Sequence, residues 1–585
     1  MDKTLNDIAN LIIDLIYNSN YSSNIDKKII NKDYVISCFE KPKNLNNGDI
    51  ALPCFKFSKY FKDSPINISN YFENILNKNI ILNNQISKVE AVNGYLNFYI
   101  NSSYTSNNIL KQIVKEKQNY GFVDEGHGKN VVIDYSSPNI AKPFHLGHLR
   151  TTVIGRTIYN LYKQLGYNCI GINYLGDWGR QFGLLIEGYK RFRDDYDIEK
   201  DPLHALSDMY VRINKLAQDD EEVMNIARDN FKKLEEGDTE YLKLWKYFRE
   251  VSLKEYKRIY DILGCHFDSY NGESYYNDKM DEVIDILDKK HVLVESNGAK
   301  VVYIDDKQPP CIIVKSNGST IYATRDLAAI IDRSRTYDYV KSIYVTSYEQ
   351  IDYFHQLFNV AKYVVDDKYV NGLVHVPYGM VRLKTGKMST RDGNVIYLQD
   401  MIEQAIQRAK DILIQKDANL ENSEDVAKKV GIGALVFNNL KHNKIKDIVF
   451  DLDEILRFDG QTGPYVQYTY VRTQSILKKA NFDIEMIDTD NIKYDLLVTD
   501  TEQNLIKLLG EFNNVIKQAA EEYEPAVLAR YLIDVASAFS KMYNDVQVIV
   551  DDSNLKNARC ILVYATSIVI KNGLKILGIE CPDKM

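Results

Sequence analysis

The stretch Asp134-Tyr-Ser-Ser-Pro-Asn-Ile-Ala-Lys-Pro-Phe-His-Leu-Gly-His-Leu-Arg150 decides the fold of this chain. It follows a short apolar run, VVIDY at 131–135, which predicts a buried strand, and it leads into a helix. Pro138 and Pro143 keep the residues between the two out of helical conformation. The strand, turn and helix therefore predict the first unit of an α/β sheet.

Two histidines stand at the start of the predicted helix. His145 and His148 are three residues apart around Gly147, so both rings can face one side of the first turn. A helix N-terminus offers free N–H groups and a positive dipole end to phosphate, and imidazoles there can add hydrogen bonds as charge builds in a transition state. Gly147 leaves room for a flat ring to approach the backbone. The alternative is a pair of surface histidines at a helix cap, but the flanking Lys142 and Pro143 favour phosphate binding.

More strands follow along the chain. CIGINYLG at 169–176 and KSIYVTS at 341–347 are apolar runs of strand length, and the helical segment 201–263 lies between them. Strands separated by helices predict a parallel sheet with crossover connections. From residue 457 to 585 the periodicity is helical throughout, and Pro525 suits the first turn of one of these helices.

Three domains are predicted: 1–105, 121–455 with a helical insertion, and 456–585. The first opens on an amphipathic helix and closes on AVNGYLNFYIN at 91–101, where Val92, Leu96 and Phe98 alternate as in one half-buried strand. The Asn-rich stretch between them has the composition of loops.

Composition excludes some classes of protein. The 585 residues carry a net charge of −8, which argues against a polycation that coats nucleic acid, although an RNA enzyme with a local basic face stays possible. The 7 cysteines are scattered and none forms C-x-x-C, so neither a zinc ribbon nor a redox motif is expected. We expect no protein-bound metal, reduced thiols and a cytoplasmic protein without a signal peptide or membrane span.

The histidine segment resembles the His-Ile-Gly-His signature of class I aminoacyl-tRNA synthetases, and Lys387-Met-Ser-Thr-Arg391 looks like their second signature, Lys-Met-Ser-Lys-Ser. The resemblance implies a doubly wound, Rossmann-like parallel sheet that binds ATP with Mg²⁺. The second lysine of the pattern is Thr390 here, so Lys142 and Arg391 are both candidates for the missing charge. By resemblance, catalytic roles fall to Lys142, His145, His148 and Lys387. Contacts to ATP fall to Pro143, Phe144, Gly147, Met388, Ser389 and Arg391.

The segments 173–183, 267–274 and 320–328 narrow the resemblance to arginyl-tRNA synthetases. A guanidinium is planar, permanently charged and best bound by carboxylates that accept paired hydrogen bonds. The resemblance gives this role to Glu273 and Asp326, with Tyr322 packed nearby. The ammonium and carboxylate ends of arginine fall to Asp134, Asn139 and Gln350. A single carboxylate is more often a surface charge, and Arg325 is an alternative partner for Asp326.

The two ends of the chain resemble RNA-binding parts of the same family. Residues 456–585 resemble its helical anticodon-binding bundle, in which Tyr465, Tyr468 and Arg472 are candidates to stack on bases and contact phosphate. The N-terminal domain resembles the extra domain that contacts the outer corner of tRNA. The implied partners are tRNA(Arg), L-arginine and ATP, the implied state is a monomer, and arginine activation is expected to require bound tRNA.

Two alternatives stay open at this point. One is another class I synthetase, such as the cysteinyl, glutaminyl or glutamyl enzyme; the cysteinyl enzyme usually has a zinc cluster, and the carboxylates favour a cationic substrate. The other is an inactive paralogue that binds tRNA, against which the intact His145, His148 and Lys387 argue.

Overall fold

The computed structural model describes residues 2–22, 25–42, 47–79, 86–304, 308–383, 397–416 and 422–585. The chain divides into two compact units. The first comprises Met1–Tyr120, Thr473–Phe512 and Ser537–Val569, and the second comprises Gly121–Arg472, Asn513–Ala536 and Ile570–Met585.

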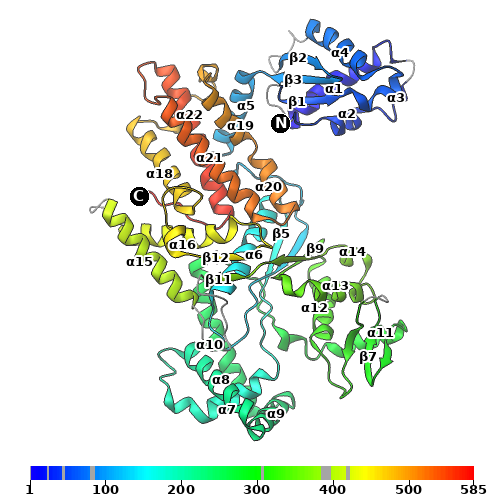
Figure 1. The fold of residues 1–585 in the computed structure, drawn as a ribbon, viewed down its shortest axis with the longest axis vertical. Coiled ribbons are helices and arrows are strands. Elements are labelled where there is room, and N and C mark those ends of the chain that lie inside the picture. The colour runs from blue at the N-terminus through cyan, green and yellow to red at the C-terminus, as the bar shows by residue number, and fades with distance from the viewer. Residues whose placement is uncertain are drawn as a thin grey trace. The chain divides into compact units, whose positions relative to one another are not determined.

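An antiparallel sheet in the order β1-β3-β2 forms the N-terminal part of the first unit, together with the helices drawn in blue in Figure 1. Its elements are α1 (Asp2–Tyr17), α2 (Lys32–Cys38), β1 (Ile50–Pro53), η3 (Cys54–Lys56), α3 (Ser58–Phe61), α4 (Pro65–Asn79), β2 (Ile86–Val92) and β3 (Tyr95–Ile100). Ile8 and Ile12 on α1 are buried against the strand residues Leu96 and Phe98. The amphipathic face of the first helix therefore covers the sheet.

The sequence-based prediction of one strand over 91–101 is wrong, because β2 ends at Val92 and a second strand begins at Tyr95. Asn93 and Gly94 between them have φ of 50° and 82°. A two-residue hairpin needs left-handed backbone at both positions, which makes Asn-Gly a favoured pair. The prediction of a loop before this hairpin is also wrong, since α2, β1 and α4 lie there and place isolated apolar residues of an Asn-rich stretch in the core.

The rest of the first unit is helical in its described residues. Its further elements are α5 (Ser102–Glu116), η5 (Lys117–Asn119), η9 (Ile484–Met486), η10 (Tyr494–Leu496), α19 (Asp500–Gly510) and parts of α18 (Gly463–Lys479), α21 (Pro525–Asp545) and α22 (Ser553–Ile576). The buried carboxylate of Glu502 pairs with Arg559 at 2.7 Å, and the Tyr120 hydroxyl donates to the Leu509 carbonyl at 2.9 Å. These contacts join α5, α19 and α22 into one core.

A parallel sheet lies at the centre of the second unit. Its strands follow the order β10-β9-β4-β5, and all three pairings are parallel. The strands are β4 (Asn130–Asp134), β5 (Asn168–Ile172), β9 (Lys341–Ser347) and β10 (Leu373–Tyr378). The three strands predicted from sequence and the parallel sheet are confirmed, although β5 ends at Ile172 rather than continuing to residue 176.

The strand order contains a switch point between β4 and β9. From β4 the chain crosses through helix α6 (Leu146–Gln164) to β5 on one side, whereas from β9 it crosses through α13 (Ile351–Ala361) to β10 on the other. Ligands of doubly wound sheets bind at the carboxyl ends of the strands at such a point. Asp134 ends β4 here, and the first signature follows it.

Helical and mixed segments are inserted between these strands (Figure 1). The predicted helical stretch 201–263 is confirmed as α8 (Pro202–Asp219), α9 (Glu221–Glu235) and α10 (Thr239–Leu263), each capped by an aspartate side chain, from Asp201, Asp220 and Asp238. The other inserted elements are α7 (Gln181–Phe192), η6 (Arg193–Asp195), η7 (Glu273–Tyr276), α11 (Met280–Lys289), β6 (Val294–Ser296), β7 (Ala299–Val302), β8 (Cys311–Val314), α12 (Tyr322–Tyr337), η8 (Tyr348–Gln350) and α14 (Asp367–Val370).

After β10 the second unit adds a short parallel pair, β11 with β12, and several helices. These elements are β11 (Val381–Leu383), α15 (Leu398–Lys416), α16 (Ser423–Leu440), β12 (Ile448–Phe450), α17 (Leu452–Ile455), α18 (Gly463–Lys479), α20 (Phe512–Glu521), α21 (Pro525–Asp545) and α22 (Ser553–Ile576). The helical nature of residues 457–585 is confirmed, with Pro525 as the first residue of α21.

Helix α6 also contacts residues from far along the chain. Arg156 donates to the carbonyls of Leu263 and Leu577, the latter at 2.6 Å, and Asn160 donates to the Ile576 carbonyl at 2.9 Å. Gly578 has φ of 71°, and a Cβ there would collide with the guanidinium of Arg156. Only glycine fits this crossing without displacement.

Three further observations bear on the class of protein. Within the described ranges, none of the helices combines the length and apolarity needed to cross a bilayer. In the same part of the chain, no three His, Cys, Asp or Glu side chains are grouped so as to hold a metal ion. All seven cysteines are free thiols, six of them buried.

Candidate active site

The turn between β4 and α6 has an irregular backbone held by the segment that follows β5. Ser136, Ser137 and Ala141 have φ of 69°, 46° and 60°. The N–H of Ile140 donates to the Gly176 carbonyl at 3.2 Å, and the N–H of Gly176 donates to the Pro138 carbonyl at 3.1 Å. This pairing places Asn139 beside Gly176, where any larger side chain would collide with the Asn139 amide.

The two histidines of the first signature cap α6. His145 is the N-cap, and its Nδ1 accepts the N–H of Gly147 at 3.1 Å. The Nδ1 of His148 accepts the N–H of His145, also at 3.1 Å. Because both Nδ1 atoms accept, the proton of each neutral ring lies on Nε2, which is left to donate to a ligand.

Burial keeps both imidazoles neutral. It lowers the pKa of His145 to about 4, with a smaller contribution from the nearby Lys142. It lowers the pKa of His148 well below its usual range, with His145 and Lys142 adding to the effect. The pair therefore donates hydrogen bonds without carrying positive charge.

Pro143 and Phe144, which precede the two histidines, line a pocket of about 240 Å³. Phe144 packs edge-on against His148, with ring centroids 5.1 Å apart. The ammonium of Lys142 lies 5.7 Å from the ring centroid of Tyr210. The backbone carbonyl of Lys142 accepts from the Tyr256 hydroxyl at 2.7 Å. Charged and aromatic residues also line the pocket, and they include Lys200, His204, Arg258 and Tyr397.

Residues 384–396 lie outside the described part of the chain, and with them Lys387, Met388, Ser389 and Arg391. The residues that flank this segment are described. Leu398 donates its N–H to the Phe144 carbonyl at 2.8 Å, and Tyr397 forms a bridge with His145. Residues 397 and 398, which follow the second signature, are therefore hydrogen-bonded or bridged to the first signature.

A cluster of carboxylates lies near the carboxyl ends of β4 and β9. Asp326 on α12 accepts hydrogen bonds from the hydroxyls of Tyr174, at 2.9 Å, and Tyr353. Burial raises the pKa of Asp326, whereas the two hydroxyls oppose that rise. Arg325 donates instead to Asn277 at 3.2 Å, so it does not occupy Asp326.

Glu273 opens η7, and its N–H donates to the Leu175 carbonyl at 2.9 Å. Burial raises the pKa of Glu273 to about 7; Arg325 opposes this rise, and Asp326 and Asp177 add to it. A cation that binds beside this carboxyl group stabilises its ionised form.

Asp134 ends β4 in an ion pair. Its Oδ2 accepts from the Arg333 guanidinium at 2.8 Å, and its Oδ1 accepts from the Ser137 hydroxyl at 2.8 Å. Arg333 is buried, with its guanidinium carbon 5.4 Å from the ring centroid of Tyr174 and 5.5 Å from that of Tyr344. The carboxylate cluster thus contains a resident arginine.

Other predicted residues lie further out. Tyr322 is 58% exposed and packs edge-on against Tyr353, with centroids 5.1 Å apart. Gln350 is exposed at the end of η8, just after β9. In α18, Arg472 lies 4.9 Å from the ring centroid of Tyr468, and Tyr465 is half-buried one turn earlier.

The sequence-based list of site residues omitted several that position the site: Tyr174, Asp177, Arg249, Arg333 and Tyr353. Arg333 follows Asp326 by two helical turns, and this spacing on one face of α12 was a usable signal. Asp177 is fully buried and accepts from Arg249 at 3.0 Å and from the N–H of Ser274 at 2.8 Å. It thereby joins the segments 173–183 and 267–274, which are far apart in sequence.

The chain matches three family models. Residues 109–452 match the class I tRNA synthetase catalytic domain of the arginine type, 466–585 the DALR anticodon binding domain, and 6–100 the arginyl tRNA synthetase N terminal domain. Together these matches cover most of the chain.

Individual relatives agree. The arginine–tRNA ligase of Clostridium botulinum is 47% identical over 555 residues, which cover 94% of this chain and 97% of the relative. That of Halothermothrix orenii is 44% identical over 557 residues, with 95% and 97% covered.

Solved structures agree as well. An arginyl-tRNA synthetase from Plasmodium falciparum superposes with a TM-score of 0.77 at 25% identity, over 94% of each chain. The Thermus thermophilus enzyme shares the fold, with a TM-score of 0.78 at 23% identity over 94% of this chain and 96% of that one. The histidine-capped helix, the carboxylate cluster and these matches lead to one conclusion: the chain belongs to the arginyl-tRNA synthetase family of class I aminoacyl-tRNA ligases.

Proposed function

We propose that this protein activates L-arginine with ATP and transfers it to the terminal adenosine of tRNA(Arg). The observation that carries the proposal is the pairing of two sites in one unit. A helix N-terminus with two neutral imidazole donors follows β4, and the carboxylates of Glu273 and Asp326 belong to the same unit. The first suits the phosphates of ATP, and the second suits a guanidinium.

In the first step, the carboxylate of arginine attacks the α-phosphorus of ATP in line, and pyrophosphate leaves. The Nε2–H groups of His145 and His148 donate to the α-phosphate as its charge builds. Lys142 adds positive charge from the turn, and Lys387, Met388, Ser389 and Arg391 of the second signature bind the other phosphates. Mg²⁺ enters with the triphosphate and offsets its charge. Pro143, Phe144 and Gly147 line the approach for adenine.

Arginine is recognised at both ends. Glu273 and Asp326 accept the guanidinium, and Tyr322 packs against it or forms a hydrogen bond nearby. The ion pair with Arg333 holds Asp134 in place, and the Asp134 carboxylate binds the substrate ammonium. Asn139 and Gln350 complete the polar end. Citrulline leaves the carboxylates without a cation, which makes it a poor substrate.

In the second step, the 2′-hydroxyl of the terminal adenosine attacks the carbonyl carbon of arginyl-adenylate, an ester to the ribose forms, and the acyl–phosphate bond breaks to release AMP. We assign residues 1–105 to the outer corner of tRNA, 121–455 to catalysis and 456–585 to the anticodon. The family models at 6–100, 109–452 and 466–585 support this division. Tyr465, Tyr468 and Arg472 on α18 are the proposed contacts to tRNA. The protein is proposed to act as a cytoplasmic monomer.

The test is charging of total tRNA with each of the twenty amino acids in turn, in the presence of ATP and Mg²⁺. Attachment of arginine alone supports the proposal. Attachment of cysteine or glutamine contradicts the carboxylate pocket but leaves the class I site intact. Binding of tRNA without any charging identifies an inactive paralogue.

A further inference from the structure

One backbone carbonyl accepts hydrogen bonds from both sides of the catalytic region. The Lys444 oxygen accepts from the Arg150 guanidinium at 2.9 Å and from the N–H of Gly379 at 2.8 Å. Arg150 is two residues beyond His148 in α6, and Gly379 lies two residues before β11 begins at Val381. Lys444 lies in the connection between α16 and β12, residues 441–447, called the bridging loop below.

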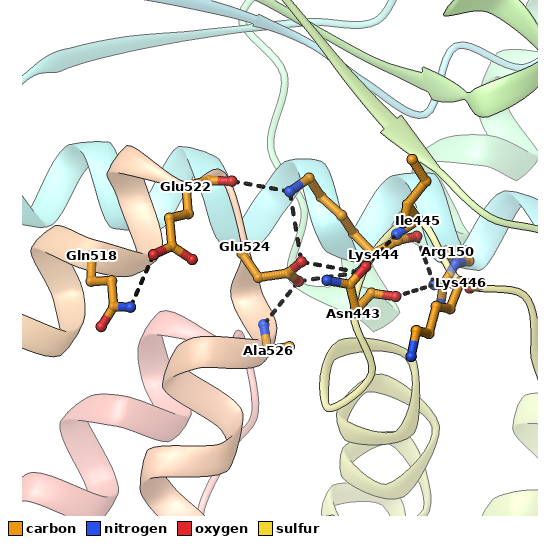
Figure 2. A network of polar contacts seen from close by, with 9 residues as sticks. All are labelled: Arg150, Asn443, Lys444, Ile445, Lys446, Gln518, Glu522, Glu524 and Ala526. Atoms are coloured by element: carbon orange, nitrogen blue, oxygen red, sulfur yellow. Dashed lines mark hydrogen bonds and ion pairs between the residues drawn. The ribbon is translucent and has the colours of Figure 1, made fainter.

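Arg150 attaches the helix of the first signature to the bridging loop. Its side chain is fully buried and donates to the Asn439 carbonyl at 3.2 Å. It also donates to the carbonyls of Lys444 and Lys446 at 2.9 Å each (Figure 2). Burial lowers the pKa of Arg150 to about 10, and the charges of Glu524 and Asp447 oppose the shift, so the guanidinium stays protonated. The planar guanidinium has several N–H donors and reaches three carbonyls at once. The compact ammonium group of a lysine does not.

Asp447 attaches the strand that enters the second signature. Its Oδ1 accepts from the N–H of Met380 at 2.8 Å, and its Oδ2 accepts from Arg382 at 2.8 Å. The N–H of Ile448 donates to the Met380 carbonyl at 2.9 Å, and Val381 pairs with Ile448 in the parallel register of β11 and β12. Residues 384–396, which contain the second signature, follow directly after β11.

Glu524 attaches the bridging loop to the turn between α20 and α21. Its carboxylate is buried and accepts from the N–H of Lys444 at 3.2 Å. It also forms an ion pair with the Lys444 ammonium at 3.6 Å, and that ammonium donates to the Glu522 carbonyl at 3.0 Å (Figure 2). The loop therefore has three attachments: to α6, to β11 and to the α20–α21 turn.

We propose that the bridging loop holds helix α6 and strand β11 in register, and that Arg150, Asp447 and Glu524 are positioning residues for the formation of arginyl-adenylate. The proposal rests on the function proposed above. A misplacement of about 1 Å between reacting groups costs roughly 100-fold in rate, so a loosened loop slows chemistry. The arginine pocket takes its partners from Tyr174, Leu175 and Tyr353, so arginine binding is unaffected.

The test compares Arg150→Lys with Arg156→Lys. Both arginines are buried in α6 and bind carbonyls, but Arg156 is two turns further from His148 and contacts Leu263 and Leu577. After normalisation to folded protein by circular dichroism, R150K should lose about 10- to 100-fold in kcat, with KM for arginine within about threefold of wild type. R156K should lose thermal stability yet keep kcat within about threefold.

Asp447→Asn provides a second test of the positioning role, because Asp447 is exposed and its replacement is compatible with folding. D447N should lower kcat with KM for arginine unchanged, and R150K with Glu524→Gln should give a non-additive loss in kcat. Equal losses in R150K and R156K, or folded R150K and D447N with wild-type kcat, overturn the positioning role. A wild-type protein that does not charge arginine instead overturns the proposed function, so the two failures are distinguishable.

Discussion

The imidazole rings of His145 and His148 lie against each other, with centroids 3.8 Å apart and planes tilted by 36°. Two protonated rings could not share this arrangement, and burial removes the charge from both. The contact gives α6 a pair of neutral donors whose direction is fixed by backbone hydrogen bonds.

Replacement of His148 by Ala should therefore affect chemistry more than binding. Loss of one preorganised donor costs about 100- to 1,000-fold in rate, and loss of its bond to the His145 N–H costs about 1 kcal/mol of stability. Charging should fall by that factor, while tRNA affinity in a filter-binding assay stays at the wild-type value. His266→Ala, at an exposed side chain, is the matched control and should change neither. Near-normal charging by H148A would contradict the donor role.

Arginine binding should depend on pH through Glu273. Its pKa of about 7, raised by burial, means that the carboxyl is partly protonated at neutral pH, and a guanidinium binds the ionised form. KM for arginine should therefore fall as pH rises toward 7, by at most about tenfold per unit, and level off above. Steady-state kinetics between pH 5.5 and pH 8.5 (roughly the range around that pKa) measure this.

The same group should affect the stability of the arginine-free protein. The folded-state pKa is raised, so this contribution to stability is present below the unfolded pKa and is lost as pH rises through about 7. Glu273→Gln should remove both the pH dependence of KM and this slope in the melting temperature. A pH-dependent KM that persists in E273Q would assign the titration to another group.

The hydroxyl of Tyr174 should contribute to arginine affinity because it donates to Asp326. A hydrogen bond to a charged group is worth about 1.5–3 kcal/mol, so Tyr174→Phe should raise KM for arginine roughly 10- to 100-fold. KM for ATP should stay near the wild-type value. Tyr363→Phe, at a half-buried tyrosine on the connection after α13, serves as control. Equal changes in the two KM values would indicate a general disturbance of the fold.

Asp177 should matter for stability rather than for recognition. Removal of one partner of a buried ion pair costs about 3–5 kcal/mol, so Asp177→Asn should lower the melting temperature by several degrees. Asp195→Asn breaks the exposed pair with Arg212 and should cost about 0–1 kcal/mol. Differential scanning calorimetry separates the two, and indistinguishable melting curves would show that Asp177 carries little of the stability.

Activation of arginine should require tRNA. Glu524 links the α20–α21 turn to the bridging loop. Contacts that bound tRNA makes at this turn would therefore reach the bridging loop and, through it, the catalytic signatures. Arginine-dependent pyrophosphate exchange should be negligible alone and appear on addition of periodate-oxidised tRNA, which binds but accepts no arginine. E524Q should reduce that stimulation. Exchange at full rate without any tRNA would refute the requirement.

Elements of this fold that depend on interactions between residues close in sequence could be predicted from the sequence. The strands at 131–135 and 341–347 and the capped helices of 201–263 were predictable because each depends on local composition. The hairpin at Asn93-Gly94 was misread because two strands of the same alternation look like one unless the turn pair is recognised.

The site divides in the same way. His145 and His148 are neighbours in sequence, so their pairing could be inferred from spacing. Asp326 accepts from Tyr353, and Asp177 accepts from Arg249. The sequence around Tyr353 or Arg249 contains no signal for a carboxylate partner on another element. Only the tertiary arrangement brings these charges together.

The crossing of Gly578 over Arg156 has a consequence for how the protein is made. Arg156 and Asn160 leave the ribosome more than 400 residues before their acceptors, Leu577 and Ile576. At roughly 5–20 residues per second, the helix that carries the histidines waits about 20–80 s for those acceptors. Until Leu577 has been synthesised, the buried guanidinium of Arg156 has the Leu263 carbonyl but not the Leu577 carbonyl as an acceptor, so helix α6 completes its contacts only after that delay.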